Sequence, residues 1–348
     1  MPEFVQATVE EVTLERRGLQ RTMVRRLDTD ATEPAYVVTD ITGPVNVHDS
    51  VVVNVTAVEL GLGTGGWHVV HWNLARSQWK QPGRGHIMKL RYTSSQLDTG
   101  AAEEADGYDA PQSLEGTPVV ACLLHSQLAA VAATIKHEAP HLRVVFVMTD
   151  SAALPLAISD LTHALRESQL IDATVTTGQA FGGDYEAVNV TSGFGVAKAL
   201  ANADVIIAGP GPGVVGSSTK LGFSGLETVA ILDEAERYGG VPVLAVRWSS
   251  ADPRPRHRGL SHHSATVLER CRPAVRLAVD AERLHSLSAE KRAVAVEIPD
   301  VASILAGSGI EVTSMGRSVA QDPGFFALAG AAGVLAAQIA STVDGCKS

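Results

Sequence analysis

From Thr117 onward the sequence alternates short apolar runs with amphipathic segments, and no other feature restricts the fold as strongly. Five apolar runs have the length and composition of buried strands, at 117–124, 143–149, 172–177, 203–208 and 241–247. Helical patterns fall between them, at 126–138, 150–168, 194–202 and 226–238. Because buried strands that alternate with helices are typical of a parallel sheet covered on both faces, we predict a Rossmann-like, doubly wound, mostly parallel α/β domain.

The first hundred residues lack this alternation and have the pattern of β structure. Short alternating or Val-rich segments follow one another without helical patterns between them, at 5–14, 20–27, 35–40, 43–54 and 67–72. A turn is expected at His48 and Asp49, where it would form a hairpin or a barrel corner. These segments predict a small β-barrel-like domain before the α/β domain.

A polar, acidic stretch after Asp98 marks a domain boundary. We therefore expect a β-rich domain at 1–100 with a last strand at 86–92, a linker at 101–116 and the α/β domain at 117–348. Beyond the fifth apolar run, strands are predicted at 274–279, 293–298 and 310–314, and a helix at 300–306. The pattern leaves open whether 272–348 extends the main sheet or forms a separate lobe.

The uncharged run 324–342 approaches the length of a membrane span, but it is rich in Ala and Gly. We expect a helix buried against the core or against a second subunit, and hence no membrane partner and a homodimer. The N-terminus has neither the basic start nor the apolar core of a signal peptide. Three cysteines without a CxxC pair also favour a reducing compartment, so a cytoplasmic location is expected.

The net charge of −10 argues against general binding of nucleic acids, because the chain repels phosphates overall. A local site for a small anion is still predicted. The fourth strand of the α/β region runs into a loop that contains the G-x-G-x-x-G pattern as Gly211, Gly213 and Gly216. Glycines after a strand allow backbone N–H groups to approach a phosphate. The alternative is a tight strand-to-helix turn.

Three observations argue against a dinucleotide in this glycine loop. The pattern follows the fourth strand of the region and not the first. Pro210 and Pro212 constrain the neighbouring backbone, and the next strand ends in Arg247, where a dinucleotide site carries an acidic residue. The cofactor therefore stays unknown.

A basic segment follows the fifth strand in an otherwise acidic chain. Its cationic and imidazole side chains are Arg247, Arg254, Arg256, Arg258, His257, His262 and His263. Arginine forks and imidazoles suit a phosphate or carboxylate. The three histidines could instead hold a metal ion, together with Asp184, Glu186 or Asp252. One of the adjacent histidines is expected to be structural, and the alternative for the whole segment is a subunit contact or a salt-bridged surface loop.

Candidate catalytic groups are fewer. Asp184 and Glu186 follow a Gly-Gly turn, where paired carboxylates can act as acid and base or bind a metal, or simply cap the turn. His262 is the third candidate. The order Ser224, Asp252, His262 is that of a hydrolase triad, but Leu226 replaces the last glycine of the nucleophile motif and Ser224 lies well past the strand.

Five motifs together carry a resemblance: GPGPGVVG (209–216), LGFSGLE (221–227), AFGGDYEAVNV (180–190), RPRHRGLSHHSAT (254–266) and GHIMKLRYT (85–93). Over nearly its whole length the chain resembles a family known only as a domain of unknown function, found mainly in actinobacteria. The resemblance implies a bacterial, cytoplasmic protein, no known activity and no established functional residues. Where that family often has Gly-Thr-Gly-Thr, this chain has Ser218 at the second glycine.

The leading interpretation is a small-molecule binding protein or enzyme whose ligand carries phosphate or carboxylate. Gly211, Gly213 and Gly216 would supply N–H donors, and the cofactor-binding side chains would be Arg247, Arg256 and His257. One alternative is a non-catalytic homo-oligomeric assembly module. A second alternative is a metal-dependent or Ser-type hydrolase.

Overall fold

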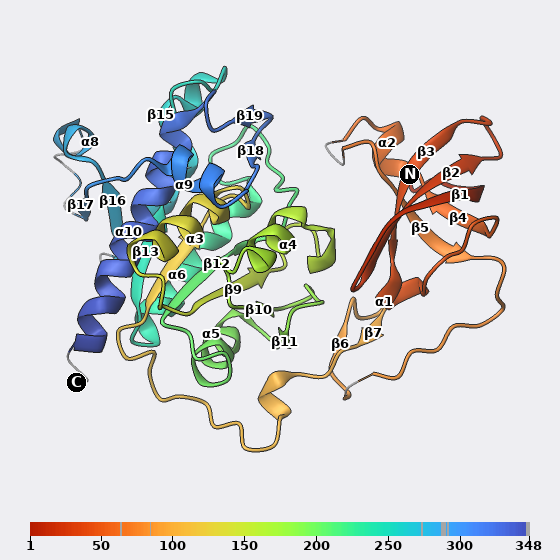
Figure 1. Cartoon of the computed structure of the whole chain (residues 1–348), viewed down its shortest axis with the longest axis horizontal. Helices are drawn as coiled ribbons and strands as arrows, with labels where there is room; N and C mark the ends of the chain where they lie inside the picture. The colour runs from red at the N-terminus through yellow and green to blue at the C-terminus, as the bar shows by residue number, and fades with distance from the viewer. Residues whose placement is uncertain (63–64, 84, 273, 287–289, 291, 346–348) are drawn as a thin grey trace. The chain divides into compact units, whose positions relative to one another are not determined.

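The computed structural model describes residues 1–62, 65–83, 85–272, 274–286, 290 and 292–345. The chain divides into two compact units, Met1–Gly100 and Ala101–Ser348 (Figure 1). Each unit has its own buried core of apolar side chains.

The first unit contains a closed five-stranded barrel in the order β1-β2-β3-β5-β4, which confirms the predicted barrel. Its strands are β1 (Phe4–Arg16), β2 (Leu19–Arg26), β3 (Thr32–Val38), β4 (Ser50–Asn54) and β5 (His68–Asn73). Short helices α1 (Thr39–Thr42) and α2 (Thr56–Glu59) connect them. Alternate residues point inward, as at Val51 and Val53, so the period-two pattern of the sequence builds the barrel core.

Two details of this unit differ from the sequence expectation. The turn at His48 does not join two strands as a hairpin, because residues 43–49 are not a strand; His48 takes a positive φ of 75° there. The strand expected at 86–92 is reduced to β6 (Met88–Lys89), which pairs with β7 (Leu97–Asp98). Leu90 and Tyr92 have positive φ, which ends the extended conformation.

The second unit is built on an eight-stranded sheet in the order β11-β10-β9-β12-β8-β13-β16-β17, and every pairing in it is parallel. This confirms the predicted Rossmann-like sheet. The central strands are β8 (Pro118–Cys122), β9 (Val144–Thr149), β12 (Val205–Pro210) and β13 (Val241–Ala245). The outer ones are β10 (Ala173–Thr176), β11 (Tyr185–Glu186), β16 (Arg276–Val279) and β17 (Ala293–Ala295).

The direction of the connections changes in the middle of this sheet. After β8 and β9 the chain moves toward β10, whereas after β12 and β13 it moves toward β16. Because crossovers between parallel strands are right-handed, the helices of the two halves cover opposite faces. One face carries α3 (Gln127–Glu138) and α4 (Asp160–Glu167); the other carries α5 (Val190–Ala199), α6 (Thr228–Arg237) and α7 (His262–Arg270). Strand β12 is inserted between β8 and β9.

The sequence pattern left open whether residues 272–348 extend the main sheet or form a separate lobe. Strands β16 and β17 extend the main sheet, and α8 (Ala281–Ser286) lies between them. A two-stranded hairpin of β18 (Thr313–Ser314) and β19 (Arg317–Ser318) follows α9 (Val301–Gly307). A second small hairpin joins β14 (Trp248–Ser249) to β15 (Gly259–Leu260).

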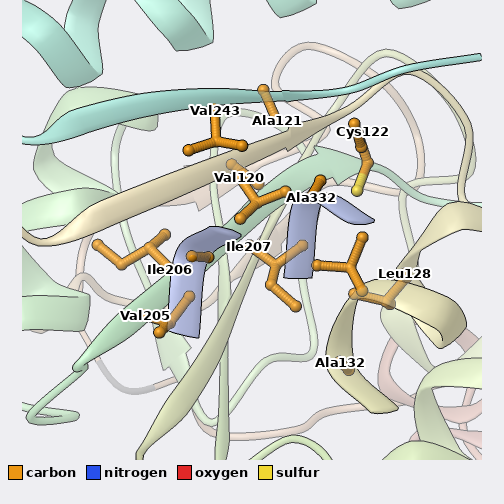
Figure 2. Close-up of a cluster of buried hydrophobic side chains, with 14 of the residues drawn as sticks. Val120, Ala121, Cys122, Leu128, Ala132, Val205, Ile206, Ile207, Val243 and Ala332 are labelled. Carbon is orange, nitrogen blue, oxygen red and sulfur yellow. The ribbon is translucent and has the colours of Figure 1, made fainter. Parts of the chain in front are cut away.

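The C-terminal helix α10 (Pro323–Gly345) packs against α3 and the sheet, and Figure 2 shows Ala332 of α10 and Leu128 of α3 in one cluster of buried side chains. Glycines on α10 allow this approach: the carbonyl oxygen of Gly330 accepts from the Thr134 hydroxyl at 2.9 Å. Among the described residues one helix is long and apolar enough to cross a membrane, and it is this one. Because 67% of its most apolar window is buried inside the unit, α10 is a core helix here.

Two predicted helices have different bounds. The helix expected at 150–168 is split into the 3-10 turn η2 (Leu156–Ile158) and α4, since the Ser159 hydroxyl accepts from the Thr162 N–H and caps a new start. The helix expected at 194–202 begins earlier, at Val190. There Asn189 and Ser192 form a reciprocal capping box.

Candidate functional site

A pocket of about 280 Å³ lies at the carboxyl edge of the sheet, where the connections change direction. Three segments that are distant in sequence line it: the end of β8 with the start of α3, the glycine loop, and the β18 hairpin. The lining residues used below are His125, Ser126, Gly213, Val214 and Ser314. The Ser126 hydroxyl donates to the Ser314 hydroxyl at 3.1 Å and joins two of these segments.

Backbone N–H groups without partners surround this pocket. Among the described residues, no hydrogen bond is made by the N–H groups of His125, Ser126, Gly213 or Val214. Gly213 is exposed and Ser126 and Val214 are half-buried, so a ligand in the pocket can reach these donors. Ser126 precedes the first turn of α3 and has no side-chain capping bond, so the positive end of the helix dipole also lies there.

His125 closes one side of the pocket as a neutral imidazole. Its side chain is buried, and burial lowers the pKa of the ring to about 4. Nδ1 donates to the carbonyl oxygen of Pro210 at 2.9 Å, and Nε2 lies 2.6 Å from the Ser159 hydroxyl. The ring is therefore fixed on both sides. His125 and Ser126 follow the first α/β strand directly, but neither was among the predicted site residues.

The three glycines of the glycine loop have different surroundings. Gly213 lines the pocket with φ +92° and has open space where a Cβ would lie. Gly211 packs against backbone, since a Cβ there would come within 2.6 Å of the Ala153 carbonyl oxygen. Gly216 forms an isolated bridge with Phe223, so the second half of the loop folds back on itself. Only Gly213 of the three thus contributes to the pocket lining.

A buried carboxyl group lies beside the same edge. Glu227, in the 3-10 turn η3 (Ser224–Glu227), accepts from the hydroxyls of Thr149, at 2.6 Å, and Ser151, both at the end of β9. Burial raises its pKa above the ordinary value, and the Asp150 carboxylate adds to the rise. A carboxyl with a raised pKa at a sheet edge is typical of functional positions. Glu227 was not among the predicted site residues, because in the sequence it lies within the helical pattern predicted at 226–238.

The predicted basic segment folds around one buried carboxylate. Asp252 is fully buried and accepts two hydrogen bonds from the Arg254 guanidinium, at 2.9 and 2.8 Å. Arg317 and Arg247 approach the same carboxylate at 3.3 and 3.5 Å. The pKa of Asp252 is accordingly held far below its usual range, first by the Arg254 hydrogen bonds. Arg247, predicted as a ligand-binding cation, is therefore engaged inside the protein.

The three histidines of the segment lie together. His257 ends the 3-10 turn η4 (Pro255–His257), and His262 and His263 occupy the first turn of α7. One ring nitrogen of each lies within 4.8 Å of the others. The ring of Phe223 stacks on His263 with centroids 3.8 Å apart, so the end of the glycine loop contacts the histidine cluster. Arg256, also predicted to bind the ligand, is exposed, with its Nε 3.4 Å from the imidazole of His257.

Asp184 and Glu186 lie elsewhere, at the outer end of the sheet. Asp184 accepts from the Thr174 N–H at 2.9 Å and pairs with Arg166 at 3.1 Å. Glu186 accepts from the Thr176 hydroxyl at 2.8 Å and from the Gly182 N–H at 2.7 Å. These contacts tie the turn to β10. The structure does not bring either carboxylate into the pocket lining or the histidine cluster.

The residues of the hydrolase pattern make other contacts. Ser224 accepts from the Val215 N–H at 3.2 Å, and Asp252 is held by arginines. Nε2 of His262 has no hydrogen-bond partner among the described residues. No relay of hydrogen bonds joins the three in the part of the chain that the structure describes.

Comparison with known families gives one match. The family model described as "Protein of unknown function (DUF3866)" matches residues 34–333, so the chain belongs to this family. No curated protein and no solved structure was found to be similar to the chain. The family assigns no activity, and the function has to be argued from the site itself.

Proposed function

We propose that this member of the family binds a small molecule bearing phosphate or carboxylate, in the pocket at the carboxyl edge of its parallel sheet. The observation that carries the proposal is a set of N–H groups around one cavity that have no partner among the described residues, those of His125, Ser126, Gly213 and Val214. N–H donors beside a helix N-terminus favour an anion, because the helix dipole is positive there.

The size and polarity of the pocket restrict the ligand. A cavity of about 280 Å³ lies near the small end of the range for ligand pockets, which favours a compact metabolite over a dinucleotide. The hydroxyls of Ser126 and Ser314 can orient the neutral part of the ligand. Glu311, which also lines the pocket, is exposed to solvent and favours a ligand with a second, cationic or hydroxyl group.

In this proposal the anion is recognised by backbone and helix dipole, and not by the basic segment. Arg247 and His257 do not line the pocket, and Arg247 is already paired with Asp252. Gly213 keeps its predicted role as an N–H donor. In this proposal the N–H groups of the glycine loop and of the start of α3 bind the anion. The sequence had instead predicted the glycine loop together with the arginines.

The substitution Ser126→Asp tests the proposal. It places a carboxylate among the proposed anion-binding N–H groups, yet Asp is a favourable residue at a helix N-terminus, so the fold is retained. Thermal unfolding is followed with inorganic phosphate, pyrophosphate, sugar phosphates and dicarboxylates. We expect one class to raise the Tm of the wild type and to leave that of Ser126→Asp unchanged.

Asn189→Asp is the matched control, because it adds the same charge at the N-cap of α5, away from the pocket lining. It should respond to the anion as the wild type does. The proposal fails if no anion raises the Tm of the wild type. It also fails if Ser126→Asp gains as much as the control.

A further inference from the structure

The histidine cluster, His257, His262 and His263, has the dimensions of a metal site. Ring centroids lie 4.8 Å apart for His257 and His262, 4.9 Å for His257 and His263, and 4.3 Å for the adjacent pair. One ring nitrogen of each lies within 4.8 Å of the others. The adjacent residues both contribute because they belong to the first turn of α7, which the Ser261 hydroxyl caps by accepting from the His263 N–H.

Two of the rings present lone pairs. A guanidinium can only donate, so the Arg247 Nη1 atom, 3.1 Å from Nδ1 of His263, faces an unprotonated nitrogen. The Arg256 Nε atom lies 3.4 Å from Nε2 of His257. Nδ1 of His257 is 2.8 Å from the Ser261 hydroxyl, the kind of contact that orients a metal-binding imidazole. A metal ion would replace two long contacts to arginine.

The third ring carries the strongest indication of a ligand. Nε2 of His262 is buried from solvent and has no hydrogen-bond partner among the described residues. A buried nitrogen without a hydrogen-bond partner is unfavourable, and a bound metal ion would satisfy its lone pair. Phe223 stacks on His263 with an interplanar angle of 5°, which shields the cluster from water on that side.

We propose that His257, His262 and His263 bind a divalent transition metal ion of the zinc class, with a fourth position open. Neutral imidazoles are common zinc ligands.

The neighbouring charges define the rest of the site. Asp252 is not available as a fourth ligand, because Arg254 holds both of its oxygens. Three arginines, Arg247, Arg254 and Arg317, surround that single carboxylate. A metal ion in such surroundings favours an anionic fourth ligand, such as hydroxide or a carboxylate. Three histidines with one open position is the ligand set of catalytic rather than structural zinc sites.

Zinc titration of the 348-residue chain tests the site. The protein is stripped with EDTA, exchanged into metal-free buffer at neutral pH and titrated with Zn²⁺ by calorimetry. We expect one ion per chain and a rise in Tm, because the unfolded chain lacks the cluster. His262→Ala and His263→Ala should each weaken binding by about 100-fold or more. His137→Ala, at an exposed position of α3, should leave it unchanged.

Two further measurements separate binding from folding. The Tm of each metal-free variant shows whether it is folded. X-ray absorption of the wild-type zinc form reports the imidazole ligands without any substitution. The proposal is overturned if the wild type binds no zinc, if His262→Ala binds as tightly as the wild type, or if the absorption spectrum lacks imidazole scattering.

Discussion

The Nδ1 atom of His125 donates to the carbonyl oxygen of Pro210 at 2.9 Å, across 85 positions of sequence. This bond joins the end of β8 to the end of β12, the strand that leads into the glycine loop. Because the other ring nitrogen lies 2.6 Å from the Ser159 hydroxyl, the imidazole is held from α4 as well. The two loops that line the pocket are therefore positioned by one buried neutral ring.

This ring should make the protein sensitive to mild acid. The pKa of His125 is lowered from 6.5 to about 4, so between these pH values the unfolded chain takes up a proton that the native ring does not. Stability is then lost as the pH falls from 6.5 toward 4. Between pH 7 and pH 5 we expect a loss of about 2 kcal/mol from this group.

Denaturant unfolding of His125→Asn at the two pH values measures this loss. The amide keeps a donor for the Pro210 carbonyl but does not titrate. The wild type should lose about 2 kcal/mol more of its free energy of unfolding than the variant between pH 7 and pH 5. Equal losses would show that the ring does not have the lowered pKa.

Asp252 should be far more important for stability than an exposed acid. Asp252→Asn leaves three arginines without their shared carboxylate, and Arg247 is buried. Removal of one partner from a buried ion pair costs about 3–5 kcal/mol. Glu269→Gln is the control: its carboxylate pairs with Lys220, and its side chain is 56% exposed. The control should cost less than about 1 kcal/mol in urea unfolding; similar effects of the two substitutions would contradict the buried network.

Replacement of glycine by alanine should have opposite effects on stability at two positions, one in the contact of α10 with α3 and one in open space. A Cβ at Gly333 would lie 2.5 Å from the Val131 carbonyl oxygen, which is backbone and cannot turn away. Gly333→Ala should therefore lower the free energy of unfolding by about 1–3 kcal/mol. Gly307, the last residue of α9, has open space, so Gly307→Ala should raise it by up to about 1 kcal/mol. Equal signs in urea unfolding would refute the close contact.

Glu227 should be a destabilising residue at neutral pH. Burial raises its pKa above 4.5, so the native state holds a proton that the unfolded chain releases, and stability falls as the pH rises above 4.5. Glu227→Gln accepts the same two hydroxyl bonds without a charge. We expect the variant to be more stable than the wild type at pH 8, with the difference shrinking toward pH 4. A variant less stable at pH 8 would contradict this.

The strands could be predicted because each is marked by a pattern of apolar residues within its own short segment of sequence. The five apolar runs of the α/β unit each became a parallel strand, and the Val-rich segments became the barrel. Strand order was not predictable, since nothing within β12 itself states that it inserts between β8 and β9. The split of the 150–168 helix was also missed, because the cap at Ser159 depends on a side-chain bond to Thr162.

The candidate site was predictable only in part, for a geometric reason. The glycine loop and the histidines were identified from residue types, and Phe223 does join them. Ser314, which lines the pocket, belongs to a hairpin far along the chain from the other lining residues. Spacing along the sequence therefore could not predict that it lies there. Asp184 was selected for its type, but its partner Thr174 lies on the neighbouring strand, where sequence spacing does not reveal the bond.

The insertion of β12 has a consequence for synthesis of the chain. A nascent polypeptide that has emerged only as far as Thr176 contains β8 and β9, but the strand that pairs with both of them has not yet emerged. The barrel strands, all within the first 73 residues, can close by then. The sheet can complete its centre only after Pro210 has left the ribosome, and its cover α10 arrives last. Vectorial synthesis therefore separates the folding of the two units in time, and the exposed edges of β8 and β9 are where a chaperone would act.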